Sequence, residues 1–160
     1  MPTRFLTLHR YWMYANRMRE YFEQALLNPD WLRLAEEHTA HPGLTFFVHD
    51  PGIFMSYWYG GLYVVIEGWR ELGLADPSID RLLTSPNVEL LRRYRNGVFH
   101  YQATYFDDRF NGFITSQDSV PWVRELNLAF GSYFLREHER GTHGENTPSA
   151  PSGGGSTPSR

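Results

Sequence analysis

The first part of the chain carries apolar residues at steps of three and four, the spacing that places side chains along one face of an α-helix. These residues are Phe5, Leu8, Trp12, Ala15, Met18, Phe22 and Leu26. The pattern predicts an amphipathic helix over residues 4–27. A second set near the other end predicts a helix over 120–140. Its members are Trp122, Leu126, Ala129, Tyr133 and Phe134.

Residues 52–72 are apolar on almost every side, which is typical of a helix in the middle of a bundle. Gly60, Gly61 and Gly68 lower the helix propensity of this segment. We therefore expect these glycines at places where a neighbouring helix or subunit comes close. The longest apolar run within it, residues 53–66, is shorter than the roughly 20 residues that span a bilayer, so it predicts no membrane segment.

Three pairs of a capping residue and a proline predict further helix starts, because proline is tolerated in the first helical turn. They are Asn28-Pro29, Asp76-Pro77 and Ser85-Pro86. The predicted helices cover 29–38, 77–84 and 86–103. Between 104 and 118 we expect a surface loop or a short hairpin that turns at Asn111-Gly112. The result is an all-α protein, an antiparallel helical bundle of four main helices with two short extra helices.

The chain of 160 residues divides into a folding part and a tail. All of its 5 Trp, 10 Tyr and 11 Phe lie before residue 141, so residues 1–140 are predicted to form one helical domain. Residues 141–160 are rich in Gly, Ser, Pro and Thr and have almost no apolar side chains. We expect them to form a disordered tail, because they bury too little to offset the entropy of ordering.

Cysteine and lysine are both absent, which excludes several kinds of chemistry. No disulfide, thiolate zinc site, Schiff base or P-loop lysine is possible. All 15 basic residues are arginine, the side chain suited to bidentate contact with phosphate. The net charge of −3 predicts local rather than general contact with nucleic acid. The start of the chain has no signal-peptide pattern, so we expect a cytoplasmic protein, and no cofactor is indicated.

The segment 90–102 contains most of the candidate functional residues. Arg92, Asn96 and His100 follow one another at four-residue steps and should share one helix face. Arg93 and Arg95 flank that face. Gly97 has no side chain to exclude an approaching backbone. The arrangement predicts that a phosphodiester or another anion binds along this edge.

The segment 95–100, with the sequence Arg-Asn-Gly-Val-Phe-His, resembles the R-x4-6-H motif of HEPN domains, which are small helical bundles. The arginine is Arg95, the polar residue after it is Asn96, and the histidine is His100. The spacing alone recurs by chance at Arg4 with His9 and at Arg33 with His38. The resemblance therefore depends on the asparagine, the apolar interior and the position in a helical chain.

The resemblance implies a metal-independent endoribonuclease, for example a toxin or defence effector. In such a site Arg95, Asn96 and His100 are the catalytic residues, and Arg92 and Arg93 are expected to bind substrate. Family members usually build the site from two motifs that face each other in a homodimer. The implied partners are RNA or nucleotide, a second copy and an antitoxin protein.

Two other functions fit the sequence. A non-catalytic HEPN-like dimer would bind nucleotide, RNA or a partner protein through the same face. A metal-binding bundle would use His38, His41 and His49, since the first two are spaced to reach one ion. Separately, Glu67 lies within the apolar helix and needs a partner, for which we expect an arginine of the 92–95 cluster in a supporting role.

Overall fold

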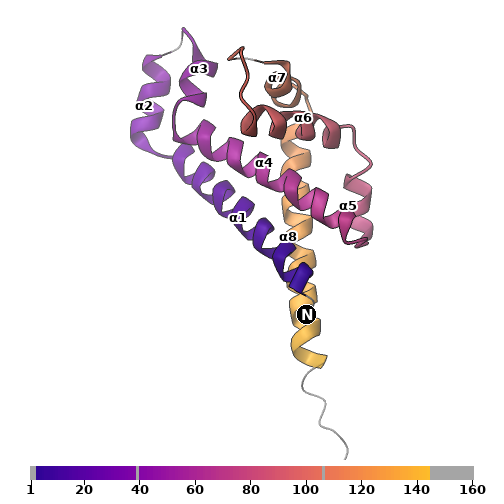
Figure 1. Ribbon diagram of the computed structural model, residues 1–160. Helices are drawn as coiled ribbons and strands as arrows, with labels where there is room; N and C mark the ends of the chain where they lie inside the picture. The colour runs from indigo at the N-terminus through magenta and orange to yellow at the C-terminus, as the bar shows by residue number, and fades with distance from the viewer. Residues whose placement is uncertain (1–2, 39, 106, 145–160) are drawn as a thin grey trace, which may run out of the picture.

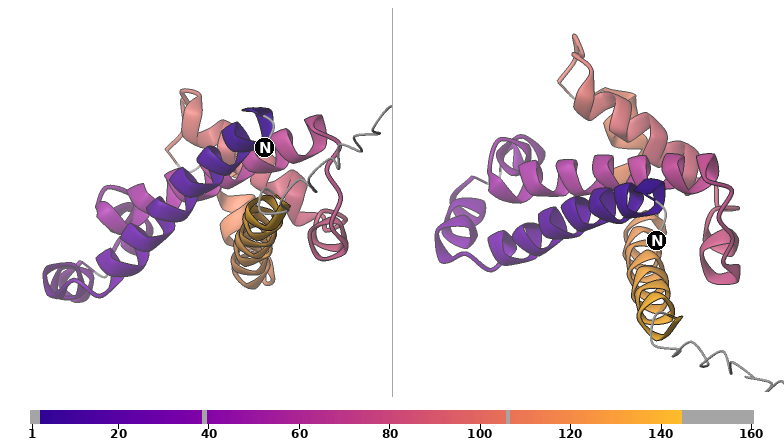
Figure 2. Two further views of the ribbon diagram at one scale, coloured as in Figure 1. Left: turned by 90° about the horizontal axis from the view of Figure 1, so that it is seen from below. Right: turned by 60° about the horizontal axis from the view of Figure 1, so that its bottom comes forward.

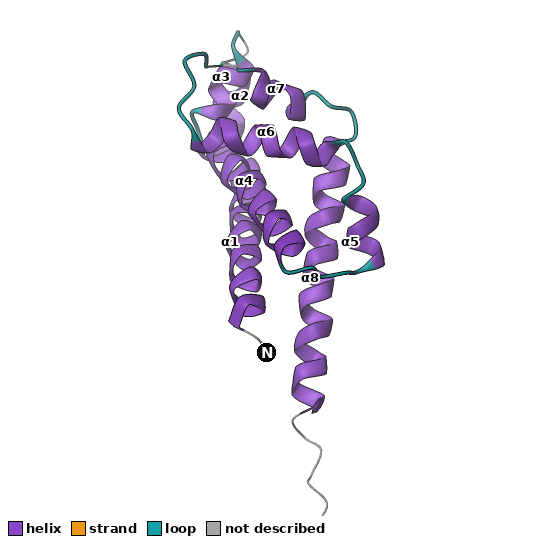
Figure 3. Cartoon of the chain, turned by 45° about the vertical axis from the view of Figure 1, so that its right-hand side comes forward, coloured by secondary structure: helices purple, strands orange, loops and turns teal. Residues whose placement is uncertain are grey.

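A computed structural model describes residues 3–38, 40–105 and 107–144, and these form eight α-helices and no strand (Figure 3). The helices are α1 (Thr3–Leu26), α2 (Pro29–Glu37), α3 (Pro42–Phe47), α4 (Asp50–Glu71), α5 (Pro77–Leu82), α6 (Asn87–Phe99), α7 (Asp108–Ile114) and α8 (Ser119–Gly144). The four long helices are α1, α4, α6 and α8. The predicted all-α bundle is therefore confirmed, with four short helices instead of two.

Helix α4 lies in the centre of the bundle (Figure 1). Helix α1 runs antiparallel to it along one side, and α6 crosses it on the other side with α7 above (Figures 1 and 2). Helix α8 crosses α1 and α4 and continues beyond the other helices. Within the described residues, none of the helices has the length and apolarity needed to cross a membrane.

The core contains the stripes that the hydrophobic pattern predicts. Leu8, Ala15 and Phe22 of α1 are buried, and the other predicted residues of this face pack against the core. Helix α4 is buried along most of its length, with Trp58 and Leu62 completely enclosed. Aromatic rings fill the space between helices, so this small domain buries large apolar areas with few residues.

The glycines of α4 lie where neighbouring helices come close, as predicted. A Cβ atom on Gly61 would lie 3.2 Å from the Cβ of Ala15, and one on Gly68 would lie 2.6 Å from Cδ1 of Leu8. On the other side, a Cβ on Gly60 would lie 2.6 Å from the ring of Phe99. These glycines therefore let α1 and α6 approach α4.

The expected caps are present at two helix starts. The Asn28 side chain accepts a hydrogen bond from the Asp30 N–H at 2.8 Å. The Asp76 side chain accepts from the backbone N–H groups of Ser78 and Ile79. These bonds satisfy amides that the helix itself leaves unpaired.

A buried amide connects three long helices. Asn127 of α8 is 1% exposed, and its Oδ1 accepts a hydrogen bond from the indole Nε1 of Trp58 at 3.2 Å. Its Nδ2 donates to the Asn16 side chain at 2.9 Å, and its backbone carbonyl accepts from Trp12 Nε1. Every polar group in this network has a partner, which fixes the register of α8 against α1 and α4.

The segment 104–118 contains a helix, so both the loop and the hairpin expected there are wrong. The Asp107 side chain caps α7 by accepting from the Arg109 N–H. Phe110 and Phe113 are three residues apart, and a helix directs both rings toward Tyr94, at centroid distances of 5.2 and 5.9 Å. Packing against Tyr94 outweighs the turn preference of Asn-Gly.

Three other boundaries differ from the predictions. Helix α3 was not predicted, because its six residues are too few to show a period. Helix α6 ends at Phe99 instead of 103, because His100 is extended and its carbonyl accepts from the Gln102 side chain. Helix α8 continues to Gly144, four residues into the expected tail, and the rest of that tail lies outside the described residues.

Candidate functional site

Helix α6 positions the side chains that the motif analysis selected. Leu91 and Tyr94 bury its inner face, and the Tyr94 hydroxyl shares a hydrogen bond of 3.0 Å with Ser56 of α4. Burial raises the pKa of Tyr94 far above the ordinary value, so its hydroxyl stays neutral in this contact. The opposite side of α6 is open and carries Arg92 and, at the end of the helix, His100.

Arg95 points toward α4, where Glu67 holds it. Its Nη2 donates to both carboxylate oxygens of Glu67, at 2.6 and 2.7 Å. Its Nη1 donates to Oδ1 of Asn96 at 3.0 Å, and its guanidinium lies 5.3 Å from the ring centre of Tyr63. The expected arginine partner of Glu67 is therefore Arg95, and Asn96 orients this arginine.

The surroundings of Arg95 include a tyrosine with a shifted pKa, and one nitrogen of the arginine itself is buried. Burial, followed by the charge of Glu67, raises the pKa of Tyr63. The Nε of Arg95 is buried and has no hydrogen-bond partner among the described residues. An acceptor that reached this nitrogen would satisfy it, because arginine binds oxyanions through two parallel N–H bonds.

The neighbouring arginines Arg92 and Arg93 differ in their hydrogen-bond and ion-pair partners. Arg92 donates from Nε and Nη2 to Glu89 at 2.7 and 2.6 Å, and this hydrogen bonding lowers the pKa of the Glu89 carboxyl. Arg93 forms no hydrogen bond or ion pair with the described part of the chain. It lies seven residues before His100, hence on the same side of the helix.

His100 ends α6 and faces an open groove of about 440 Å³. Its N–H donates to the Asn96 carbonyl at 3.1 Å, and its carbonyl accepts from Gln102 Nε2 at 2.7 Å. The side chain is exposed. We call this the His100 groove; it is lined by Phe47, Ile53, Ser56, Tyr57, Gly97, Val98, Phe99, His100, Tyr101, Gln102, Thr104, Tyr105 and Phe110.

One chain does not bring the motif arginine to the motif histidine. Arg95 binds Glu67, whereas His100 shares its groove with Tyr57 of the same helix α4. Along α6 the positions of Arg95 and His100 are five residues apart, a rise of about 7.5 Å. Arg95 is absent from the groove lining. The structure therefore joins the side chains of Arg95, Asn96 and Glu67, whereas the His100 side chain lines the groove.

The open edge expected at Gly97 is closed. A Cβ on Gly97 would lie 3.0 Å from the ring of Phe110, because α7 packs over this position. Gly97 thus provides room for a ring of the same chain. The close approach expected at this glycine is made by Phe110 of α7, a helix that the sequence pattern did not predict.

The three histidines proposed as metal ligands do not form a site. His38 Nδ1 lies 3.1 Å from the Leu34 carbonyl, and His49 Nδ1 lies 2.6 Å from the Thr45 carbonyl. His41 precedes α3 and makes no capping bond through its side chain. Among the described residues, no group of three or more His, Asp or Glu side chains is placed to hold a metal ion.

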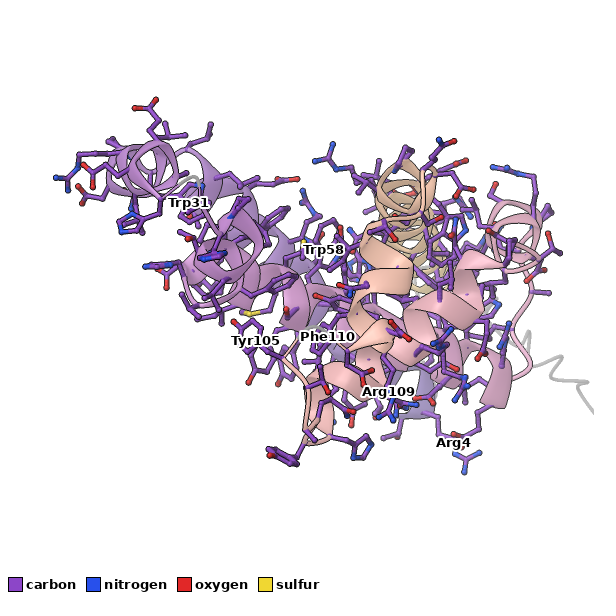
Figure 4. All side chains as sticks on the ribbon, turned by 90° about the horizontal axis from the view of Figure 1, so that it is seen from above. Arg4, Trp31, Trp58, Tyr105, Arg109 and Phe110 are labelled. Carbon is purple, nitrogen blue, oxygen red and sulfur yellow. The ribbon has the colours of Figure 1, made fainter. Side chains whose placement is uncertain are left out.

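The aromatic character of the His100 groove was not predicted. Tyr101 and Tyr105 follow the motif closely in the sequence, and this was the one available signal. Figure 4 shows Tyr105 and Phe110 on the same side of the molecule, away from Trp31. Comparison of the chain with protein-family models, curated proteins and solved structures finds no match.

Proposed function

We propose that this chain is a HEPN-like, metal-independent endoribonuclease that acts as a homodimer. The observation that carries the proposal is the exposed imidazole of His100, at the end of an arginine-bearing helix and beside an open groove. Imidazole titrates near neutral pH and is suited to proton transfer, and arginine is suited to phosphate. These are the residue types that RNA cleavage without a metal requires.

The reaction is a transesterification within the RNA. An imidazole removes the proton of a ribose 2′-hydroxyl, whose oxygen attacks the adjacent phosphorus while the bond to the 5′-oxygen breaks. A second group protonates that leaving oxygen, and the products are a 2′,3′-cyclic phosphate and a 5′-hydroxyl. Among the described residues that line its groove, His100 is the only histidine, so His100 of a second copy is suited to supply the other proton transfer.

In this proposal the arginines bind the phosphate and stabilise its charge. Arg93 forms no salt bridge among the described residues, although its charge acts on the nearby Glu89 carboxylate, and it lies on the same side of α6 as His100, so it suits initial binding. Arg95 would stabilise the growing negative charge of the transition state. It does so only when phosphate replaces or joins the Glu67 carboxylate, since both Glu67 oxygens accept from its Nη2.

The contact between Arg95 and Glu67 also favours a second function. If Glu67 keeps Arg95 permanently, the protein binds RNA or nucleotide without cleaving it. The two functions share the face that contains Arg93 and His100. They differ in whether the phosphate ever reaches Arg95.

The test is incubation of the purified protein with mixed RNA in the presence of a chelator. We expect cleavage to fragments that end in a 2′,3′-cyclic phosphate. His100→Ala should reduce the rate by about 10² to 10⁴ without loss of thermal stability, because the exposed ring contributes little packing. Arg95→Ala should reduce it similarly.

His41→Ala is the matched control, because His41 is also exposed and also lies at a helix end. We expect it to cleave like the wild type. Cleavage that requires a divalent ion, or that survives His100→Ala, contradicts the nuclease. RNA binding without any cleavage selects the second function.

A further inference from the structure

The His100 groove leaves large aromatic side chains exposed. Tyr101 is 94% exposed, Tyr105 53%, Tyr57 51% and Phe99 48%. Three of them carry a hydroxyl, so their rings are polar at one end and apolar on both faces. Exposed apolar surface gathered at a concave place marks a binding site on a soluble protein.

One wall of the groove is held in place by packing. The rings of Tyr57 and Phe99 meet edge to face, with a centroid distance of 5.9 Å and an angle of 68° between planes. The Phe99 ring packs against the backbone of Gly60. Its nearest carbon lies 2.6 Å from the position that a Cβ atom on Gly60 would occupy. A fixed ring loses little freedom when a flat ligand stacks on it, which favours binding.

The groove differs from two others in its lack of carboxylates. Among the described residues that line it there is neither an acid nor an arginine. The groove between α1 and α2 is also aromatic, but Asp30 and Asp50 line it. Another groove, beside α1 and α4, is lined by Glu67 and Glu71. An RNA strand therefore meets fewer carboxylates beside His100 than in these two grooves.

Polar groups in the groove can form hydrogen bonds with the edge of a planar ligand ring. Gln102 Nε2 is used by the His100 carbonyl, but its amide oxygen accepts no hydrogen bond within the described residues. Thr104 adds a hydroxyl to the lining. An amide and a hydroxyl beside stacking rings are the contacts that proteins use for unpaired nucleobases.

We propose that the His100 groove is a stacking site for an unpaired nucleobase of single-stranded RNA. The inference rests on the proposed function and narrows its substrate. A base on Tyr57, Phe99 or Tyr101 brings its own ribose beside the imidazole of His100. Double-stranded RNA is excluded, because its bases are stacked within the helix and cannot enter the groove.

The test measures binding of a labelled, unstructured RNA oligonucleotide by fluorescence anisotropy, with His100→Ala present in every protein to prevent cleavage. Tyr57→Leu and Tyr101→Leu keep an apolar side chain but remove the ring. We expect each to weaken binding by about tenfold, the range typical of one stacked base. The same RNA in duplex form should bind weakly to all variants.

Tyr14→Leu is the matched control, because Tyr14 is 61% exposed on α1 and is not among the groove residues. It should bind like the parent protein. Equal binding by the Tyr57 and Tyr101 variants overturns the inference, as does absence of single-stranded RNA binding by the parent. A change from dimer to monomer in light scattering overturns it too, since the rings would then form a contact between copies.

The outcome of this binding test can be distinguished from the outcome of the cleavage test of the proposed function. Weakened binding by the two tyrosine variants upholds the stacking site even if the wild-type protein never cleaves RNA. Conversely, cleavage that is lost in His100→Ala but unchanged in Tyr57→Leu and Tyr101→Leu upholds the nuclease and rejects the stacking site.

Discussion

Glu67 and Arg95 are joined through a single nitrogen: Nη2 of the arginine donates to Oε1 at 2.6 Å and to Oε2 at 2.7 Å. The arginine side chain is 23% exposed and the glutamate side chain 46%. A partly exposed pair of this kind contributes little to stability, about 1 kcal/mol or less. Its main effect is to neutralise the charge that a phosphate would otherwise meet.

Glu67→Gln is therefore expected to strengthen RNA binding. The amide keeps the size of the side chain but removes the competing charge, and about 1 kcal/mol of lost competition corresponds to roughly fivefold in affinity. The gain should shrink as salt is added, because exposed charges are screened. Anisotropy titrations at two salt concentrations, with His100→Ala present to prevent cleavage, measure both effects.

The control for this change is Glu125→Gln, which removes the partner of Arg81 between α8 and α5. It should leave RNA affinity unchanged. Weaker RNA binding by Glu67→Gln would mean that Glu67 positions Arg95 for phosphate instead of competing with it.

Two glycine substitutions should change stability in opposite directions. A Cβ on Gly52 would lie 2.3 Å from the carbonyl oxygen of Phe46 and 2.7 Å from Cα of Phe47, and backbone atoms cannot move aside cheaply. We expect Gly52→Ala to lower the free energy of unfolding by about 2 to 4 kcal/mol. Urea unfolding followed by circular dichroism gives this value.

Gly112→Ala is the matched substitution. Its Cβ would lie 3.7 Å from Cδ2 of Leu90, an ordinary contact, and the position is inside α7. Alanine should raise the free energy of unfolding by about 0.5 to 1 kcal/mol through helix propensity. A loss of stability at Gly112 would contradict the helical assignment that replaced the expected loop or hairpin.

The sequence predicted the fold wherever a helix buries a full stripe. Leu8, Ala15 and Phe22 of α1 show this, because three turns of one face suffice to display the period. Helices α3 and α7 were missed because each has only six or seven residues. In α7 the decisive contact is with Tyr94, which is distant in the sequence, so local turn preference gave the wrong answer.

The arginine partner of Glu67 was predicted, but the surroundings of His100 were not. The sequence showed that Glu67 needs an arginine, and Arg95 fills that role. It did not show that this contact turns Arg95 away from His100, because the directions of two side chains on one helix depend on which neighbour each meets. The groove beside His100 depends on α3, α4 and α7 together, so no local pattern reports it.

Stability should depend on pH through His9. Burial, with a smaller effect of the nearby His138, lowers the pKa of the His9 imidazole below its ordinary value. As pH falls from 7.5 to 5.5, the unfolded chain takes up a proton near pH 6.5 while the folded protein takes it up only at lower pH, so stability decreases. Thermal unfolding across this range measures the slope.

His9→Phe should make that slope shallower. The imidazole lies between Trp12, at 5.8 Å, and Phe134, at 4.9 Å, and a phenyl ring preserves these contacts without titrating. Parallel curves of melting temperature against pH for the variant and the wild type would show that His9 is not responsible.

Mixing two inactive variants should restore cleavage if the site forms between copies. The Arg95 side chain binds Glu67 and is not among the residues that line the groove of His100, so the arginine that serves a phosphate beside His100 can come from the second copy. In a mixed dimer of Arg95→Ala and His100→Ala, the intact arginine comes from one chain and the intact histidine from the other. About half of the dimers are mixed when subunits exchange at random. A mixed dimer keeps only one of the two His100 imidazoles, so we expect activity above that of either variant alone but below that of the wild type. The assay is RNA cleavage after co-incubation, with the double variant Arg95→Ala/His100→Ala added to either single variant as the control that should not recover. No recovery in the mixture, with exchange confirmed by mass, would place the arginine and the histidine in the same chain during catalysis and require Arg95 to leave Glu67.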